Sequence, residues 1–547
     1  MPDDIRSEPL SDALHRFRWV YCQLETLRHC LPPSVRGILA EMPETLDATY
    51  ERILQEIPKS NQVYAHRLLQ CLTVASRPLR VKELAEVIAV DFTASDGIPK
   101  LNEALRWEDQ EQAVLSACSS LISVIEGSDE DSDSDSDEDS DEDFQVVQFS
   151  HFSVKEFLTS DRLAASDLDV SRYHYITLEP AHTVMAQACL SVLLRLDPHI
   201  DRASIKDYPL AQYANEHFGE HAEFGSVLSH ILTGIDHLLD ADKYHFDVCV
   251  RVHPLRHLLR YSGLQQDVTP LYYVASRGYR GMMDYLISKR PDDVNLGGAY
   301  GTPLHGALDN AHADAAELLL QYCVDVDVRD YEGRTPLHLA AYHGFLGVTR
   351  TLVERNADIH VRCRLGNTPL HQTMYAWFEK SESTQDGRLD VAKILLERGA
   401  DPDAKNGVLE TPLQEASYYG SVKGAQLMLE HGANIHARNQ NGRTLLHQVF
   451  VRLYDSSSAL DLFLDTIRFL LKHGADINAL DNDHATPLHL ASRHGCAKGA
   501  QLLLELGANV HLEDKKGRTP LQVAWEERIP KVTQLLSEHL QSTKDMT

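Results

Sequence analysis

The chain has 547 residues, of which 43% are hydrophobic and 24% charged, a composition typical of a globular protein with two to four domains. Its formal net charge of −29 disfavours nucleic acids and other polyanionic partners. The nine cysteines include no Cys-x-x-Cys pair, which indicates reduced thiols in a cytoplasmic protein and argues against a disulfide framework or a zinc site. The polar start "MPDDIRSEPL" predicts no signal peptide, and no apolar run approaches the ~18 residues of a membrane span.

Four amphipathic helices are predicted near the start of the chain, over residues 42–57, 61–76, 79–90 and 107–121. The runs "SLISVIE" and "FQVVQFSHF" follow, and their Val, Ile and Phe content predicts two β-strands. A closing helix is predicted at "SVKEFLTSDRLA". Helices followed by a β-hairpin are the pattern of a winged-helix domain, which we place at residues 31–165.

The most acidic segment, "GSDEDSDSDSDEDSDED", lies between the two predicted strands, where residues 128–143 would form an enlarged wing loop. It supplies 11 acidic residues, so the rest of the chain still carries −29 + 11 = −18. Such a run is typical of a disordered, solubilising loop. The alternative is a phosphorylation switch, because five serines have an acidic residue three positions later, as acidophilic casein-kinase-type enzymes prefer. These serines are Ser128, Ser132, Ser134, Ser136 and Ser140.

Residues 166–262 are predicted to form a helical connector. It contains "HFGEH", in which His217 and His221 match the zinc ligands, and Glu220 the general base, of one class of metalloprotease. We reject this interpretation, since Gly219 disfavours the required helix by ~1 kcal/mol and short patterns match by chance. No other catalytic motif stands out, so we expect no enzyme activity, no metal and no cofactor.

An internal repeat built on Thr-Pro-Leu-His is the strongest signal in the chain. Its eight copies begin 33, 33, 33, 43, 33, 42 and 33 residues apart, a period that is hard to obtain by chance. They start at Thr269, Thr302, Thr335, Thr368, Thr411, Thr444, Thr486 and Thr519.

The third copy shows the physical basis of the repeat. Thr335 can cap a first helix, and Pro336 takes its first position, where a missing N–H costs nothing. Later copies end the second helix with a glycine suited to a left-handed C-cap, namely Gly399, Gly432, Gly474 and Gly507. These residues closely resemble ankyrin repeats, whose helix pairs stack into a solenoid. The resemblance implies that one histidine per repeat ties adjacent turns by hydrogen bonds instead of binding metal: His305, His338, His371, His447 and His489.

Two insertions lengthen the fourth and sixth copies, at residues 375–388 and 452–462. We expect both to be loop extensions that project from the same edge, opposite the hairpin tips, because connecting loops accept insertions at little cost. The alternative is that Trp377 and Phe378 in the first insertion contact a partner.

Several segments of the N-terminal half resemble the winged-helix region that follows the nucleotide-binding NACHT module in fungal NLR-like proteins with ankyrin repeats. They are "LPPSVRGILAEMPETLDATYERIL", "RPLRVKELAEVIAVDF", "RWEDQEQAVLSACSSLISVIE" and "VVQFSHFSVKEFLTS". The segment "RFRWVYCQLETLRHC" looks like the last helix of such a NACHT module, so residues 1–30 are expected to be its remnant. "YPLAQYANEHFGEHA" is similar to a motif in the connector of those proteins.

Two activities that this resemblance could suggest are not expected. The chain has no G-x-x-x-x-G-K-[ST] loop to hold a triphosphate, so we predict neither nucleotide binding nor ATPase activity. DNA binding by a winged helix would place residues 107–121 in the major groove. That segment has no Lys or Arg and carries Glu108, Asp109 and Glu111, so it would repel the duplex, as would the acidic wing.

The sequence therefore predicts a mainly α protein: a winged-helix domain with a small β-hairpin, a helical connector, and a C-terminal ankyrin-repeat α-solenoid over residues 263–547. We expect a non-enzymatic module that binds a protein partner through the concave face and hairpin tips, with a separate NACHT-containing protein as one candidate partner. The alternative is a stand-alone adaptor, such as a ubiquitin-ligase substrate receptor. The expected contact residues are Tyr331, Glu332, Arg334, Arg364, Leu365, Asn367, Val408, Glu410, Gln440, Asn441, Arg443, Asp483, His484, Lys515, Lys516 and Arg518.

Overall fold

The computed structural model describes residues 45–93, 98–106, 109–118, 121–126, 145–164, 174–200, 205, 208–240, 243–252, 268–298, 300–375, 382–453 and 460–545. The chain divides into two compact units, Met1–Gln266 and Asp267–Thr547. The predicted NACHT remnant, the acidic tract with its five serines, and Trp377 and Phe378 lie outside the described residues. The protein is mainly helical, as predicted.

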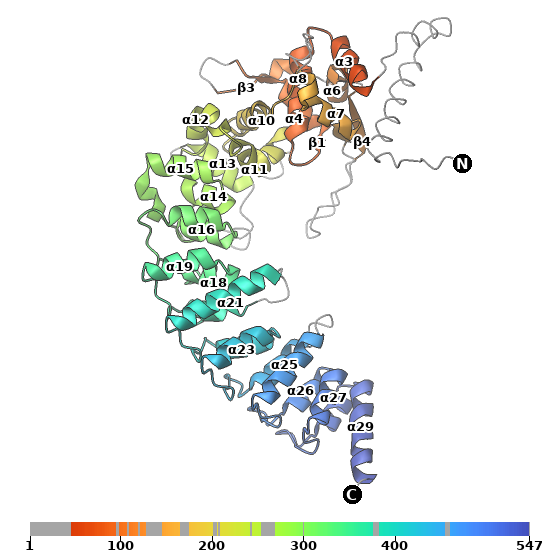
Figure 1. The fold of residues 1–547 in the computed structure, drawn as a ribbon, viewed down its shortest axis with the longest axis vertical. Helices are drawn as coiled ribbons and strands as arrows, with labels where there is room; N and C mark the ends of the chain where they lie inside the picture. Colours follow the sequence, from red (N-terminus) through yellow and green to blue (C-terminus); the bar gives the residue numbers. More distant parts are fainter. Residues whose placement is uncertain are drawn as a thin grey trace, which may run out of the picture. The chain divides into compact units, whose positions relative to one another are not determined.

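The first unit consists of helices around a small sheet (Figure 1). The side-chain oxygen of Thr45 accepts a hydrogen bond from the N–H of Ala48 and caps the first helix. The elements are α3 (Leu46–Glu56), α4 (Gln62–Val74), β1 (Leu79–Arg80), α5 (Val81–Ile88), β2 (Val90–Asp91), β3 (Lys100–Leu101), the 3₁₀ turn η2 (Glu103–Leu105), α6 (Gln110–Cys118), β4 (Ile122–Glu126), β5 (Gln145–Phe149), α7 (Phe152–Leu158), α8 (Asp161–Ala164), α10 (Leu178–Leu193), α11 (Pro209–Ala222), α12 (Val227–Leu238) and α13 (Tyr244–Val252).

The predicted β-hairpin is present, and it belongs to a sheet with the strand order β1-β5-β4. Strands β4 and β5 pair antiparallel, with Ile122 opposite Phe149. Strand β1 pairs antiparallel with the other edge of β5, where Leu79 lies opposite Val147 and is fully buried. The prediction of one helix over residues 79–90 is wrong at its start, because Leu79 and Arg80 are extended and pair with a strand distant in sequence.

The helices α10 and α11 pack onto the helices that precede them in the same unit. Helix α10 contacts α4, α11 and α12, and α11 contacts α5. The buried carboxylate of Glu86 in α5 accepts a hydrogen bond from the N–H of Leu210 at the start of α11, at 2.9 Å. The segment predicted as a connector therefore shares a core with the helices predicted for the winged-helix region.

The second unit is a stack of helix pairs arranged in two rows (Figure 1). Each inner helix packs on the next inner helix, and most outer helices pack on their outer neighbours in the same way. The inner row is α14 (Pro270–Arg277), α16 (Pro303–Asp309), α18 (Pro336–His343), α20 (Pro369–Thr373), α22 (Pro412–Tyr418), α24 (Leu445–Leu453), α26 (Pro487–Arg493) and α28 (Pro520–Glu526). The outer row is α15 (Arg280–Lys289), α17 (Ala313–Leu319), α19 (Leu346–Glu354), α21 (Glu382–Glu397), α23 (Val422–Glu430), α25 (Leu460–Lys472), α27 (Ala497–Glu505) and α29 (Pro530–Asp545), with a 3₁₀ turn η6 (Pro291–Asn295) after α15.

The helix boundaries of the repeats follow the predicted capping residues. Thr335 is an extended N-cap and Pro336 is the first residue of α18. Four outer helices end at glycines in the left-handed region, where a side chain is disfavoured. Their φ angles are 93° at Gly399, 86° at Gly432, 98° at Gly474 and 91° at Gly507. The predicted C-caps are thus confirmed.

The two insertions are partly helical. Helix α21 begins at Glu382, so the prediction of a loop over residues 375–388 is wrong for its second half. No proline interrupts this segment, and the outer helix therefore extends backward into the insertion. Arg388 is fully buried there, and its Nε donates a hydrogen bond to the carbonyl of Tyr342 at 2.6 Å. In the second insertion α25 begins at Leu460, which is likewise helical.

Candidate protein-interaction surface

Each described hairpin turn from the third repeat onward, except the fourth, is closed by the side chain of one Asp or Asn residue. In the third repeat, Oδ1 of Asp330 accepts hydrogen bonds from the backbone N–H groups of Glu332 and Arg334, at 2.9 and 2.8 Å. The N–H of Asp330 donates to the carbonyl of Arg334 at 2.9 Å. The turn therefore holds its shape from within. Equivalent bonds are made by Asn406, Asn439, Asp481 and Asp514.

Backbone hydrogen bonds also join neighbouring hairpins at their tips. The N–H of Arg364 donates to the carbonyl of Glu332, and the N–H of Gly407 to that of Leu365, each at 2.8 Å. The tips thus form a continuous row whose side chains can differ without loss of these bonds. The same link joins Gln440 to Val408 at 3.1 Å, Asn482 to Asn441 at 2.9 Å and Lys515 to Asp483 at 2.9 Å.

The repeat histidines fix five of the described hairpins to the helix of the preceding repeat. In the third repeat Nδ1 of His338 accepts from the N–H of Thr335 at 3.1 Å, and Nε2 donates to the carbonyl of Asn367 at 3.0 Å. Burial lowers the pKa of His338, His371 and His447 to about 4. The predicted hydrogen-bonding role is confirmed, and the Nε2 bond recurs at His305, His371, His447 and His489.

The predicted contact residues differ in how accessible they are. Asn367 is only 4% exposed, so the prediction that its side chain projects toward a partner is wrong. Its backbone carbonyl lies under the hairpin, where it accepts the bond from His338. The half-buried side chains are Tyr331, Glu332, Arg334, Glu410, Arg443 and Arg518. The exposed ones are Arg364, Leu365, Val408, Gln440, Asn441, Asp483, His484, Lys515 and Lys516.

Two of the half-buried arginines belong to the framework of the hairpins. Nε of Arg334 lies 2.7 Å from Oδ2 of Asp330, and its Nη1 lies 3.1 Å from Oδ1 of Asp309. Arg518 makes matching ion pairs of 2.7 Å with Asp514 and Glu526. These neighbouring carboxylates raise the pKa of both guanidinium groups. Because their charges are already paired, these arginines offer less to a partner than the exposed tips do.

An exposed apolar patch lies in the middle of the row of tips, and sequence reasoning identified only part of it. Leu365 is 71% exposed, Val408 40% and Leu409 46%. The bond between Gly407 and Leu365 brings the two tips together. We call Leu365, Val408 and Leu409 the apolar tip patch. The sequence analysis did not include Leu409. An apolar residue within a turn was the sequence feature that could have indicated its exposure, because a turn residue does not reach the core.

A buried polar network below this patch was also missed. Oε1 of Glu410 accepts from Nδ2 of Asn439 at 2.9 Å and from the side chain of Gln448 in the next repeat. Oε1 of Glu415 accepts from Nδ2 of Asn406 at 3.3 Å. Burial, together with the charge of Glu410, raises the pKa of Glu415 to about 7. The sequence signal was Glu415 at the repeat position that Leu339 and Leu490 occupy.

The second histidine of "HFGEH" in the first unit, His221, has structural partners at both ring nitrogens. Nε2 of His221 is 2.8 Å from the hydroxyl of Tyr213, and its Nδ1 is 2.9 Å from Nδ1 of His182. Burial lowers the pKa of His221 to about 3. Since both ring nitrogens of His221 are engaged by protein groups, this residue acts as a neutral link between α10 and α11.

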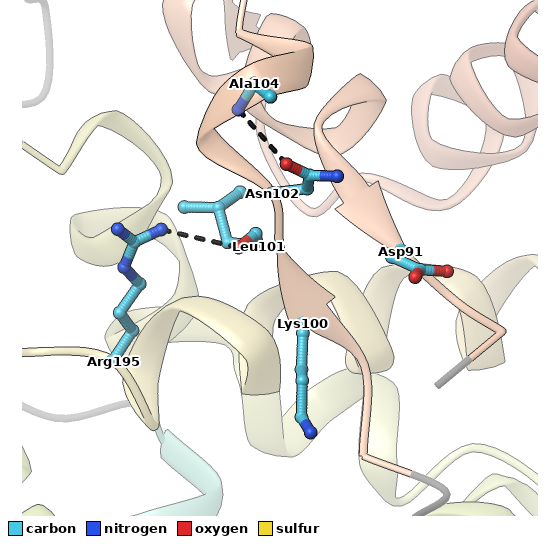
Figure 2. Close-up of a pocket in the computed structure, with 6 residues that line it drawn as sticks. All are labelled: Asp91, Lys100, Leu101, Asn102, Ala104 and Arg195. Carbon is cyan, nitrogen blue, oxygen red and sulfur yellow. Dashed lines mark hydrogen bonds between the residues drawn. The ribbon is translucent and has the colours of Figure 1, made fainter. Parts of the chain in front are cut away.

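A pocket in the first unit lies beside strand β3 and the end of α10. It has a volume of about 410 Å³ and is lined by Asp91, Lys100, Leu101, Asn102, Ala104 and Arg195. Nη1 of Arg195 donates to the carbonyl of Leu101 at 3.4 Å. Figure 2 shows that the side chain of Lys100 points away from Arg195, so the two cations do not converge on one ligand. We therefore assign no binding role to this pocket.

Stacked helix pairs, row-forming hairpins and histidine links define a helical repeat protein. The chain belongs to the ankyrin-repeat family, whose three-copy description matches overlapping segments 249–330, 271–363, 322–406, 380–452, 413–514 and 457–546. Ankyrin repeats imply a role in protein–protein interaction. None of the helices in the described part of the chain has both the length and the apolar character that a membrane crossing requires.

Known relatives resemble parts of the chain. An azaphilone pigments biosynthesis cluster protein L from Monascus ruber is 28% identical over 308 residues, which cover 53% of this chain and 61% of that protein. A putative E3 ubiquitin-protein ligase XBAT31 from Arabidopsis thaliana is 32% identical over 113 residues, covering 20% of this chain and 24% of the relative. Cyclin-dependent kinase 4 inhibitor B from Rattus norvegicus is 34% identical over 109 residues, covering 20% of this chain and 77% of the inhibitor. The chain thus spans less than two thirds of the first two relatives.

Proposed function

We propose that this protein is a non-enzymatic interaction protein, and that its row of hairpin tips with the adjoining inner helices binds a protein partner. One observation carries this proposal: a constant hydrogen-bonded framework presents side chains of different chemistry. The tips offer an acid at Glu332, a cation at Arg364, apolar groups in the apolar tip patch, and cations again at Lys515 and Lys516. A fixed backbone with variable exposed side chains is what recognition of a specific partner requires.

We further propose that the chain works in a NACHT-type, NLR-like signalling system in the cytoplasm of a fungus. The resemblance of the N-terminal segments to the winged-helix region of such proteins supports this context. The likeness to a Monascus ruber protein over 308 residues supports a fungal origin. Helices beside a three-stranded sheet in the first unit fit the proposed winged-helix domain. In this proposal a separate NACHT-containing protein supplies the nucleotide switch, and phosphorylation of the acidic tract adds a second control.

The second candidate is a stand-alone adaptor that delivers a bound protein to a ubiquitin ligase. The likeness of one part of the chain to a putative E3 ubiquitin-protein ligase favours it. The two candidates use the same recognition surface and differ in the protein complex to which the chain belongs.

The test compares proteins that co-purify with the tagged full chain and with its variants. Leu365→Asp combined with Val408→Asp places two charges in the apolar tip patch, whereas Glu354→Lys changes an exposed residue of outer helix α19. We expect the double variant to lose at least about tenfold of the captured partner, since a charge must be desolvated there, and the control to lose none. Equal capture by all three proteins would contradict the proposed surface. A NACHT protein among the partners supports the first candidate, and ligase subunits support the second.

A further inference from the structure

One position of the repeat hairpins carries a positive charge in four successive repeats. It lies six residues before the Thr that begins each repeat motif, and in the third to sixth repeats it holds Arg329, Arg362, Lys405 and Arg438. All four side chains are exposed. In the part of the chain that the structure describes, none of them forms an ion pair with a carboxylate. We call these four residues the cationic column.

Hydrogen bonds to the backbone hold three of these guanidinium groups in place. Nη1 of Arg329 donates to the carbonyl of Arg362 at 3.0 Å. Nη1 of Arg362 donates in the same way to the carbonyl of Lys405, and Nη1 of Arg438 to the carbonyl of Leu480. Each arginine therefore reaches the residue at its own position in the next repeat. A carbonyl does not neutralise the charge, and the Nε and Nη2 edge of each group stays available for a carboxylate.

The hairpin tips of the fourth to sixth repeats are cationic as a group. Residues 362–367, 405–410 and 438–443 contain five cations and one acid, so their net charge is 5 − 1 = +4. The same six positions carry no net charge in the third repeat and −2 in the seventh. Salt screens charges more than ~8 Å apart at physiological ionic strength, so the local cations decide what binds at these tips in spite of the net charge of −29.

The acids that neighbour the column in sequence bind other groups. Oδ1 of Asp327 and Oδ1 of Asp403 each accept from a backbone N–H of the next repeat, at 2.9 and 2.8 Å. Asp330 pairs with Arg334 at 2.7 Å. Glu410 accepts from two amide side chains of the sixth repeat. The column therefore stays available to a carboxylate from another molecule.

Exposed leucines occupy the column position on either side of the four cations. Leu296 in the second repeat is 52% exposed, and Leu480 in the seventh is 37% exposed. Nη1 of Arg362 also donates to the carbonyl of Gly366 at 3.1 Å, so this guanidinium group lies beside the residue that follows Leu365 of the apolar tip patch. A polyphosphate such as a nucleic acid would satisfy the cations and leave these apolar groups in water. An acidic peptide can satisfy both.

We propose that the cationic column binds an extended acidic segment of the protein partner, in which Asp or Glu residues stand three positions apart. This inference rests on the proposed function and specifies the chemistry of the partner. Neighbouring helices of stacked repeats lie ~8–10 Å apart. A polyproline II segment has three residues per turn and advances about 9 Å in each turn, so every third side chain lies on the same side. Each carboxylate of such a segment can meet one cation of the column.

The experiment selects peptides from a phage-displayed random library on the immobilised full chain and measures their affinities by fluorescence polarisation. Lys405→Glu reverses one charge of the column, and Lys393→Glu, at an exposed position of outer helix α21, is the matched control. A second variant combines Arg362→Leu with Arg438→Leu. The column position holds Glu513 in the eighth repeat and Leu in the second and seventh, so these replacements are compatible with the fold. Thermal unfolding of every variant shows that it is folded before binding is measured.

We expect the selected peptides to share Asp or Glu residues three positions apart. Their affinity should fall about tenfold with Lys405→Glu, because an exposed ion pair is lost and a repulsive pair replaces it. It should fall at least as much with the double variant and stay unchanged with Lys393→Glu. Affinity for the unchanged chain should also fall as salt rises, since the cations are exposed.

Peptides without such acids, or peptides whose affinity ignores both column variants, would overturn the column as a binding site. If those peptides still lose affinity when Leu365→Ser is combined with Val408→Ser, the proposed function stands without the column. Displacement of the peptides by a single-stranded oligonucleotide would assign the column to a polyphosphate and overturn the inference. Tighter binding of a synthetic peptide of residues 127–143 would also overturn it, because the occupant would then be the acidic tract of the chain itself. Failure to select any peptide would count against both the column and the proposed function.

Discussion

Burial keeps the repeat histidines neutral, and the hydrogen bonds that they make require the neutral ring. His338 accepts a hydrogen bond at Nδ1 and donates one at Nε2. Protonation of Nδ1 would break the bond that this nitrogen accepts. Its pKa is about 4 in the folded chain, against an ordinary value of 6.5. Between pH 6.5 and pH 4 the unfolded chain therefore binds more protons than the folded chain. The free energy of unfolding falls as the pH is lowered through this range. We expect each such histidine to reduce the free energy of unfolding by about 2 kcal/mol at pH 5 relative to pH 7.5.

Urea unfolding followed by circular dichroism at both pH values measures this loss. The informative variant is His338→Gln, because Gln414 makes the equivalent two bonds in the fifth repeat, to the N–H of Thr411 and the carbonyl of Arg443, both at 3.1 Å. It should reduce the acid-dependent loss by about 2 kcal/mol. His436→Gln, at an exposed position, is the matched control and should leave the loss unchanged. An identical loss in both variants would show that His338 is not responsible.

The carboxyl group of Glu415 is expected to reduce stability above neutral pH. Its folded pKa of about 7 lies above the ordinary value of 4.5, so its contribution is favourable below pH 4.5 and is lost as the pH rises to 7. Leu339 and Leu490 occupy the same position in other repeats. We therefore expect Glu415→Leu to raise the free energy of unfolding at pH 8 by roughly 1 to 3 kcal/mol, measured by urea unfolding. A destabilised variant would mean that the carboxylate is better satisfied than its contacts indicate.

At the scale of single elements, two glycines that follow helices differ in how closely a neighbouring helix approaches their backbone. Gly344 follows α18 with φ of 76°, and an added Cβ would lie 2.7 Å from the backbone nitrogen of Arg388 in α21. Gly432 follows α23 with φ of 86° and has nothing within 4 Å of that point. Gly432→Ala should cost about 1 kcal/mol for the left-handed conformation. Gly344→Ala should cost at least about 2 kcal/mol more, because α18 and α21 must also move apart. Equal losses in thermal or urea unfolding would contradict this close approach.

Element boundaries were predictable where a residue acts on its own helix. Thr335 and Pro336 start α18, and Gly399 ends α21, because capping depends on a few adjacent groups. The start of α21 at Glu382 was not predictable, since an insertion of polar residues is compatible with either a loop or a longer helix. Strand β1 was missed for another reason: its two residues are extended because they pair with β5, which is distant in sequence.

At the scale of the whole molecule, the solenoid could be predicted because every repeat encodes its own caps and its link to the next repeat. The polar network around Glu410 could not. Its carboxylate comes from the fifth repeat, its amide partner Gln448 comes from the sixth, and only stacking brings them together. The burial of Asn367 could not be predicted either, because nothing in the sequence distinguishes a buried residue beside an exposed turn from an exposed one.

The charge of the whole chain leads to a last prediction, which concerns DNA. Helix α6 would be the groove-reading helix of a winged-helix domain, yet it contains Glu111 and no Lys or Arg. Non-specific DNA binding depends on cations that replace the counterions of phosphate, and the chain has a formal net charge of −29. We expect no shift of a 30-base-pair duplex in native gels at 50 mM salt with about 10 μM protein. DNA-binding proteins bind non-specific DNA with dissociation constants of about 10⁻⁴ to 10⁻⁶ M at physiological salt, and they bind it more tightly at 50 mM salt. A complex that weakens steeply as salt rises would contradict the expectation that this protein does not bind DNA, since phosphate neutralisation produces that slope.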